Sequence, residues 1–229
     1  SINVGPFRPL ERQAVATPGA MYFTYWMYGP GPSQTPVSVE ALHTLTVRAV
    51  DAPGNAREAT LKFIVDKTPP AISLLANGAP LVTGTIFDED VTLAATVQDN
   101  SAVTTVASLN TDTVTLPLPV AQEQAHTITV KSTDIAGNSA TVEGAFTVDK
   151  TAPVIVVRAN GSELAAGASF RADVTLSWSA TDLTLNTTTA TLNNNTIPSG
   201  FVVTTEGEHT LVVTATDKAG HSKSEARSF

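Results

Sequence analysis

The sequence predicts an all-β chain of tandem β-sandwich domains, and an internal repeat is the main observation behind this prediction. The stretch His43-Thr44-Leu45-Thr46-Val47 returns 83 residues later from His126, and again after the same interval from His209. An Asp-x-x-Gly turn follows each copy, and a phenylalanine lies 20 residues after each histidine. A gapless repeat of this length indicates small domains in series rather than one large domain.

The composition supports β structure and excludes several classes of function. The chain of 229 residues is 42% hydrophobic and 15% charged, and its many Val and Thr residues fit a half-buried pleated surface. The net charge of −8 argues against nucleic-acid binding, which needs clustered Lys and Arg. No apolar run reaches the ~20 residues that cross a bilayer, so no membrane insertion is expected. The absence of cysteine excludes thiolate metal sites and cysteine nucleophiles.

The elements are clearest in residues 67–149. Strands are expected, in order, at residues 71–75, 91–97, 103–120 (several short segments), 126–132 and about 140–148. The turn pair Asn77-Gly78 ends the first of these strands, and Pro117 and Pro119 suit an edge or a loop. Short strands separated by turn signals every ~8–12 residues, with no helical periodicity, indicate a β-sandwich of about one hundred residues or fewer.

The repeat divides the chain into three predicted domains, at residues 1–66, 67–149 and 150–229. The third domain matches the second without a gap, whereas the first has no counterpart of the first strand and aligns poorly over residues 1–36. Two interpretations of the first domain stay open. Either it is a divergent unit cut by a boundary, or it lacks an edge strand that another chain supplies by β-strand addition. Short, proline-containing linkers between the domains predict an elongated, semi-rigid rod.

These motifs resemble bacterial immunoglobulin-like (Big) repeats. The shared pattern is His-Thr-Leu-Thr-Val, then Asp-x-x-Gly-Asn, then Phe-x-Val-Asp-Lys-Thr-x-Pro, and it covers residues 37–229. Pro53 in the first Asp-x-x-Gly-Asn turn and His221 in the third depart from it. The resemblance implies a non-catalytic array, secreted or on the bacterial cell surface, as in large adhesins or accessory regions of extracellular enzymes.

Six aspartates are the candidate metal ligands. In an immunoglobulin-type sandwich, the loop after the second strand and the loop before the last strand lie at the end where the chain enters, next to the incoming linker. This topology predicts two sets of converging carboxylates: Asp66, Asp99 and Asp134, and Asp149, Asp182 and Asp217. Like charges at close range repel unless a cation neutralises them, and Ca2+ accepts six to eight oxygen ligands in a flexible geometry. We therefore expect Ca2+ at each set, with the loop Asp88–Asp90 as a further contributor to the second.

A simpler interpretation of these aspartates requires no metal. Asp51, Asp134 and Asp217 would cap their turns, while Asp66 and Asp149 would pair with Lys67 and Lys150 or face water. The sequence alone leaves both interpretations open.

No catalytic arrangement is predicted. His43, His126 and His209 lie on separate repeats, so they cannot share an ion, and each is expected to bond to the local backbone. The sequence contains neither a Gly-x-Ser-x-Gly nucleophile elbow nor a phosphate-binding glycine loop. The chain is therefore not expected to be an enzyme.

An aromatic segment at residues 21–28 is a candidate ligand-binding surface. Tyr22, Tyr25, Trp26 and Tyr28 could stack on a host or matrix glycan or contact a protein partner, although such residues more often belong to a core. Trp178, in a predicted central strand, is expected to be a core residue.

The leading functional prediction is an extracellular, adhesive or structural stalk segment made rigid by Ca2+ at the domain junctions. One alternative is a filament subunit that self-associates through its incomplete first domain by strand donation. The others are a glycan- or protein-binding module that uses residues 21–28, and the accessory region of a secreted enzyme.

Overall fold

β-Strands are the only regular secondary structure in the part of the chain that the structure describes. The computed structural model describes residues 24–25, 33–34, 37–50 and 55–229. The all-β prediction is confirmed. Within these residues, no helix is long and apolar enough to cross a membrane.

The chain divides into two compact units. The first comprises residues 1–70, 99–104 and 133–139, and the second comprises residues 71–98, 105–132 and 140–229. This division does not follow the 83-residue step. The domain boundaries predicted from the repeat stay predictions, so the segments 1–66, 67–149 and 150–229 are called the first, second and third repeat.

Two antiparallel hairpins are described in the first repeat. The short strands β1 (Thr24–Tyr25) and β2 (Ser33–Gln34) pair with each other. The longer strands β3 (Ala41–Val50) and β4 (Ala56–Val65) form a two-stranded sheet. In its register His43 lies opposite Phe63, and the two rings stack with centroids 5.3 Å apart.

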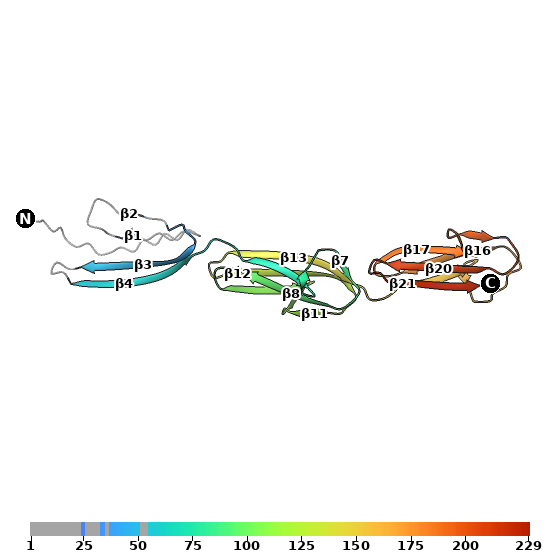
Figure 1. The fold of residues 1–229 in the computed structure, drawn as a ribbon, viewed down its shortest axis with the longest axis horizontal. Helices are drawn as coiled ribbons and strands as arrows, with labels where there is room; N and C mark the ends of the chain where they lie inside the picture. Colours follow the sequence, from blue (N-terminus) through green and yellow to red (C-terminus); the bar gives the residue numbers. More distant parts are fainter. Residues whose placement is uncertain (1–23, 26–32, 35–36, 51–54) are drawn as a thin grey trace, which may run out of the picture. The chain divides into compact units, whose positions relative to one another are not determined.

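The second repeat contains two sheets (Figure 1). The first has the strand order β11 (Leu118–Val120), β8 (Val91–Gln98), β5 (Ala71–Ala76) and β6 (Ala79–Pro80). The second has the order β10 (Asp112–Val114), β9 (Val103–Leu109), β12 (Gln124–Asp134), β13 (Ser139–Val148) and β7 (Thr85–Phe87). All the predicted strands are present, and the short strands β6 and β7 are additions. Strand β7 was not predicted because it is held by a parallel pairing with the end of β13, which local sequence does not reveal.

The predicted turn chemistry is also confirmed. Asn77 and Gly78 have φ values of 50° and 80°, as a two-residue hairpin turn with two positive φ angles requires. The Asn77 Oδ1 atom accepts a hydrogen bond from the Thr92 N–H at 2.8 Å, which holds this turn against β8. Pro119 lies in β11, at the edge of its sheet, where a missing N–H costs no ladder hydrogen bond.

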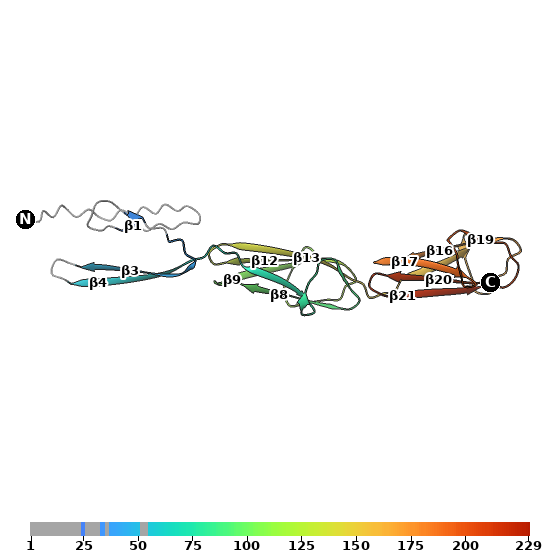
Figure 2. The ribbon, with the colours of Figure 1, turned by 45° about the horizontal axis from the view of Figure 1, so that its top comes forward.

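The third repeat has the same architecture (Figure 2). One sheet has the order β15 (Ser162–Glu163), β14 (Val154–Ala159), β16 (Val174–Thr181) and β19 (Phe201–Val203). The other has the order β18 (Asn195–Thr196), β17 (Leu185–Leu192), β20 (Thr210–Asp217) and β21 (Ser222–Ser228). Residues 168–170, the counterpart of β7, form no strand.

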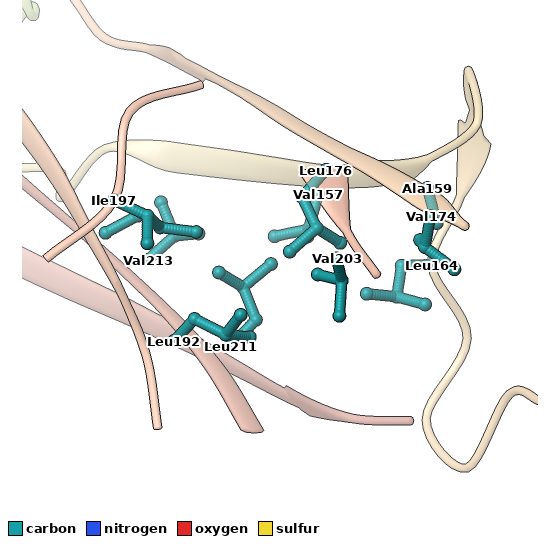
Figure 3. Packing of buried hydrophobic residues seen from close by; sticks show 11 residues of the cluster. Val157, Ala159, Leu164, Val174, Leu176, Leu192, Ile197, Val203, Leu211 and Val213 are labelled. Carbon is teal, nitrogen blue, oxygen red and sulfur yellow. The ribbon is translucent and has the colours of Figure 1, made fainter. Parts of the chain in front are cut away.

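Each complete sandwich has an apolar core at positions that obey the repeat. The core of the third repeat includes Val157, Leu176, Leu211 and Val213 (Figure 3), and the core of the second includes their counterparts Leu74, Leu93, Ile128 and Val130. Burial alternates along β20, because successive strand residues point to opposite faces. Trp178 is partly buried and packs against the core of the third repeat.

The three repeated histidines bond to the local backbone, as predicted. In each repeat the Nε2 atom lies 2.8–2.9 Å from the carbonyl oxygen four residues earlier, on Val39, Gln122 and Thr205. His126 stacks on Phe146 with a centroid distance of 5.1 Å, and His209 contacts Phe229 at 5.6 Å. These contacts give each imidazole a structural role at the start of its strand.

Candidate metal centre

The six candidate aspartates form two clusters of three. The first acidic cluster consists of Asp66, Asp99 and Asp134, and the second consists of Asp149, Asp182 and Asp217. In each cluster one carboxylate oxygen from every member lies within 4.8 Å of the others. One member follows the last strand of a repeat, one follows β8 or β16, and one ends β12 or β20. The structure thus gathers the carboxylates that the topology predicted to converge.

The aspartate at the end of β12 or β20 is fixed by the turn that follows it. Asp134 Oδ1 accepts a hydrogen bond from Asn138 N at 2.8 Å, and its Oδ2 accepts one from Asn138 Nδ2 at 2.7 Å. Asp217 Oδ1 accepts hydrogen bonds from the backbone N–H groups of Gly220 and His221, at 2.7 and 2.8 Å. The turn-capping role predicted for both residues is therefore present, and it fixes the orientation of each carboxylate within its cluster.

The aspartate after β8 or β16 closes a short turn with its own side chain. Asp99 Oδ1 accepts hydrogen bonds from Ser101 N at 2.7 Å and Ser101 Oγ at 2.8 Å. Asp182 Oδ1 accepts one from Thr184 N at 2.8 Å. This is the usual behaviour of Asp two residues before a turn N–H, and it fixes one oxygen of each carboxylate.

Each linker aspartate has a buried carboxylate oxygen without a hydrogen-bond partner among the residues that the structure describes. Asp149 is fully buried, and its Oδ2 accepts a hydrogen bond from Thr184 Oγ1. Its Oδ1 is buried and has no hydrogen-bond partner among the described residues. Asp66 repeats this pattern, because its Oδ1 accepts a hydrogen bond from Thr68 N at 3.2 Å, whereas its buried Oδ2 has no partner in the described part of the chain. A buried, unpartnered carboxylate oxygen is costly, so both clusters have a place for a further electropositive group.

The lysines next to these aspartates do not supply that group. Lys150 Nζ donates to Asp90 Oδ1 at 2.8 Å and to the Ala121 carbonyl oxygen at 2.9 Å, and Lys67 Nζ donates to the Ser38 carbonyl oxygen at 2.6 Å. Within the described residues, the Asp–Lys ion pairs of the simpler interpretation are therefore not formed. The expectation that the loop 88–90 adds to the second cluster is also wrong, because Asp90 pairs with Lys150 instead.

Burial, hydrogen bonds and neighbouring charges shift the pKa values of three of these aspartates. Burial raises the pKa of Asp182 above its ordinary value, and the charges of Asp149 and Asp217 raise it further. Burial also acts to raise the pKa of Asp134 and Asp217, but hydrogen bonds from Asn138 in one case and from the turn at His221 in the other lower the net pKa of each. In the second cluster, therefore, Asp182 resists ionisation while Asp217 favours it.

This difference predicts an effect of Asp182→Asn in the presence of a chelator. A carboxyl with a raised folded-state pKa contributes stability that is fully present below the unfolded value of 3.8 and lost as the pH rises through the folded value. We expect the variant to unfold a few degrees above the parent at neutral pH, with a difference that closes as the pH falls below about 4. Thermal unfolding across this pH range measures it, with the exposed Glu163→Gln as a control. A difference that grows on acidification would contradict the prediction.

One difference between the two clusters lies in the turn after β12 or β20. Asn138 Nδ2 donates both to Asp134 and to the Asp66 carbonyl oxygen, at 3.1 Å for the latter. In the second cluster His221 occupies the corresponding position, with its Nδ1 3.0 Å from Asp217 Oδ2. In the sequence, His221 lies alone in a turn and departs from the Asp-x-x-Gly-Asn pattern. It follows Asp217 by four residues, as Asn138 follows Asp134 one 83-residue step earlier.

The donor set in both clusters is made of oxygen atoms alone. Hard divalent cations prefer such ligands, and Ca2+ in particular accepts carboxylates and backbone carbonyls without a strict geometry. The residues present therefore fit Ca2+ chemically, and the unpartnered oxygens of Asp66 and Asp149 are the atoms that a cation would satisfy.

The aromatic candidates lie largely outside the described residues. This applies to Tyr22, Trp26 and Tyr28, and for Tyr25 only the backbone pairing in β1 is described. Their proposed contact with a glycan or protein partner, and self-association through the first repeat, stay predictions.

Comparisons with known proteins do not assign the chain to a family. No protein-family model matches it, and no curated protein matches it. Similar solved structures include the fibronectin(III)-like modules of Clostridium thermocellum CbhA, at 15% identity over 68% of this chain and 92% of that one, with a TM-score of 0.30. The strand orders of the second and third repeats show an immunoglobulin-like β-sandwich fold.

Two further solved structures are similar at the same low level. Dimeric latent PorU from Porphyromonas gingivalis is 12% identical over 91% of this chain and 28% of that one, with a TM-score of 0.32. The SGBP-B protein of a Bacteroides ovatus mixed-linkage glucan utilization locus, in complex with a mixed-linkage heptasaccharide, is 10% identical over 71% of this chain and 70% of that one, with a TM-score of 0.28. These values are too low to transfer a ligand or an activity.

Proposed function

We propose that this chain is a non-catalytic segment of an extracellular bacterial stalk in which Ca2+ joins successive immunoglobulin-like repeats. The observation that carries the proposal is the buried Asp149 carboxylate, whose Oδ1 has no hydrogen-bond partner among the described residues. It lies beside Asp182 and Asp217, and a cation there would satisfy that oxygen and neutralise three like charges at once.

The proposed role of the ion is mechanical. Asp149 directly follows β13 of the second repeat, whereas Asp182 and Asp217 belong to the third. An ion shared by these three carboxylates would restrain the linker between β13 and β14 at its first residue. Asp66, Asp99 and Asp134 would act in the same way after β4. The resemblance of residues 37–229 to Big repeats supports the same function.

Isothermal titration calorimetry of the whole chain tests the ion binding. We expect two Ca2+ sites with dissociation constants of roughly 10⁻⁴–10⁻³ M, the range of extracellular modules, and weaker binding of Mg2+. Asp149→Ala should remove one site and Asp66→Ala the other, while Glu163→Gln should retain both. No heat of binding at millimolar Ca2+ would refute the proposal.

The mechanical role has its own readout. The chain has no cysteine, so Asp112→Cys and Glu163→Cys allow spin labels to be attached at one exposed position in each of the second and third repeats. The distance distribution between the labels should narrow when Ca2+ is added, and it should not narrow when Asp149→Ala is also present. If calorimetry shows Ca2+ binding but the distance distribution does not change on its addition, the chain has a metal site and the mechanical role is refuted.

A further inference from the structure

The second repeat holds the linker that follows it by a specific set of contacts. The end of β13 pairs in parallel with β7, with Val148 opposite Phe87, and the Asp149 N–H donates to the Phe87 carbonyl oxygen at 2.9 Å. Lys150 Nζ donates to Asp90 and to the Ala121 carbonyl oxygen. Thr151 Oγ1 donates to Glu123 Oε2 at 3.0 Å. Together these contacts hold an extended Val-Asp-Lys-Thr segment, which we call the linker segment.

Two of these contacts also occur one repeat earlier. Lys67 Nζ donates to the Ser38 carbonyl oxygen at 2.6 Å, and Thr68 Oγ1 donates to Glu40 Oε2 at 2.6 Å. Each of these residues lies 83 positions before its counterpart in the second repeat. Two independent copies thus show that a Lys-Thr pair is recognised by one carbonyl oxygen and one glutamate.

In the third repeat, the residues that correspond to those holding the linker segment line a pocket of about 360 Å³. The lining residues that matter for recognition are Phe170, Asp173, Thr204, Glu206, His209 and Phe229. The first four of them occupy the positions of Phe87, Asp90, Ala121 and Glu123, shifted by 83 residues.

The glycine that precedes this segment makes the same backbone hydrogen bond to the last strand of its repeat in the second and third repeats. The Gly167 N–H donates to the Ser228 carbonyl oxygen at 2.7 Å, as the Gly84 N–H donates to that of Ala145 at 2.7 Å. Beyond this point the repeats differ, because residues 168–170 form no strand and Phe170 is 40% exposed, whereas Phe87 lies in β7 and is half-buried.

We propose that this pocket binds an extended peptide segment of the Val-Asp-Lys-Thr type. The lysine ammonium would meet the Asp173 carboxylate and the Thr204 carbonyl oxygen, and the threonine hydroxyl would meet Glu206. The segment's backbone would pair with residues 168–170 and convert them to a strand like β7. Charge complementarity supports a basic residue in this place, because Asp173 and Glu206 line the pocket.

One substitution gives the pocket its own selectivity. The second repeat has Asp88 and Glu89 before Asp90, whereas the third has Arg171 and Ala172 before Asp173. Arg171 lines the pocket, so the site combines one cationic and two anionic side chains. A segment with Asp directly before Lys matches that arrangement better than a segment with two basic residues.

A peptide titration of the whole chain tests the proposal. The ligand is the capped peptide Thr-Val-Asp-Lys-Thr-Ala-Pro, the sequence of residues 147–153, added to ¹⁵N-labelled protein in the presence of a chelator. We expect saturable chemical-shift changes at the pocket residues with a dissociation constant of roughly 0.1–10 mM. Replacing the peptide lysine with alanine, or introducing Glu206→Gln, should weaken binding at least about fivefold. The matched control Glu163→Gln should bind as the parent does.

A second measurement tests for binding that is too weak to detect with the free peptide. The same residues are attached directly after Phe229, which raises their effective concentration to the millimolar range, and thermal unfolding is followed in the presence of a chelator. The attached segment should raise the unfolding midpoint, and its lysine-to-alanine version should lose most of that rise. Stabilisation by the attached segment supports the proposal even if the free peptide fails to bind. The proposal is overturned if neither measurement responds, or if the peptide's shift changes fall outside the pocket. Because both measurements exclude Ca2+, their failure would leave the calcium proposal untouched.

Discussion

Addition of about 10 mM Ca2+ is expected to raise the unfolding midpoint of the third repeat by roughly 6–20 °C. A ligand that binds only the folded state stabilises it by RT ln(1 + [L]/Kd), which is about 1.4–2.7 kcal/mol for a Kd of 0.1–1 mM. For a domain of this size, each kcal/mol corresponds to about 4–8 °C. The sequence contains two tryptophans, Trp26 and Trp178, so Trp178 fluorescence in a Trp26→Phe background follows the third repeat alone.

Asp149→Asn should remove most of this calcium effect. The Asp149 carboxylate is fully buried and has one oxygen without a partner among the described residues, so replacing it with a neutral amide also removes a buried like charge from beside Asp182 and Asp217. In a chelator the variant should therefore be at least as stable as the parent, and in Ca2+ it should be less stable. Glu163→Gln is the control. An equal shift from Mg2+, or a full calcium shift in Asp149→Asn, would contradict the assignment of this site.

Leu176→Ala is expected to destabilise the third repeat by about 2–5 kcal/mol. Leu176 is 0% exposed in β16, within the core shown in Figure 3, and truncating a buried leucine costs its transfer free energy and leaves a cavity. The measurement is urea unfolding followed by Trp178 fluorescence in the same Trp26→Phe background.

The adjacent strand offers a matched control. Val202 in β19 lies opposite Thr175 and is 46% exposed, so Val202→Ala should change the unfolding free energy by less than about 0.5 kcal/mol. The denaturant slope should be the same in both variants, because the surface exposed on unfolding hardly changes. Equal destabilisation by the two substitutions would show that the core is not where the structure places it.

Much of the fold was predictable because the repeat and the strand pattern are local in sequence. Val91–Gln98 alternates apolar and polar residues in part, and Asn77-Gly78 has the chemistry of a two-residue turn, so β5, the turn that ends it and β8 follow from short-range rules. Strand β7 does not follow from them. Its three residues are a strand because they pair with Phe146–Val148, about 60 positions away in the chain.

The candidate site was predictable in part for a related reason. Asp99 and Asp134 were placed by topology, because the ends of known strands fix where the loops lie. The ion-pair partner of Lys150 could not be predicted, because a lysine side chain can reach several carboxylates and only the folded structure places Asp90 next to it. The glutamates that accept a hydrogen bond from the linker threonines left a usable signal, because Glu40, Glu123 and Glu206 recur at the interval of the histidines.

The three carboxylates of the second acidic cluster come from both sides of Lys150 in the sequence. Asp149 precedes Lys150, whereas Asp182 and Asp217 lie well after it. A fragment that starts at Lys150 would keep two of the three carboxylates and lose the most deeply buried one. Affinity measured on such an isolated fragment would therefore understate that of the intact array. The smallest piece able to report on this cation must include the residue just before Lys150.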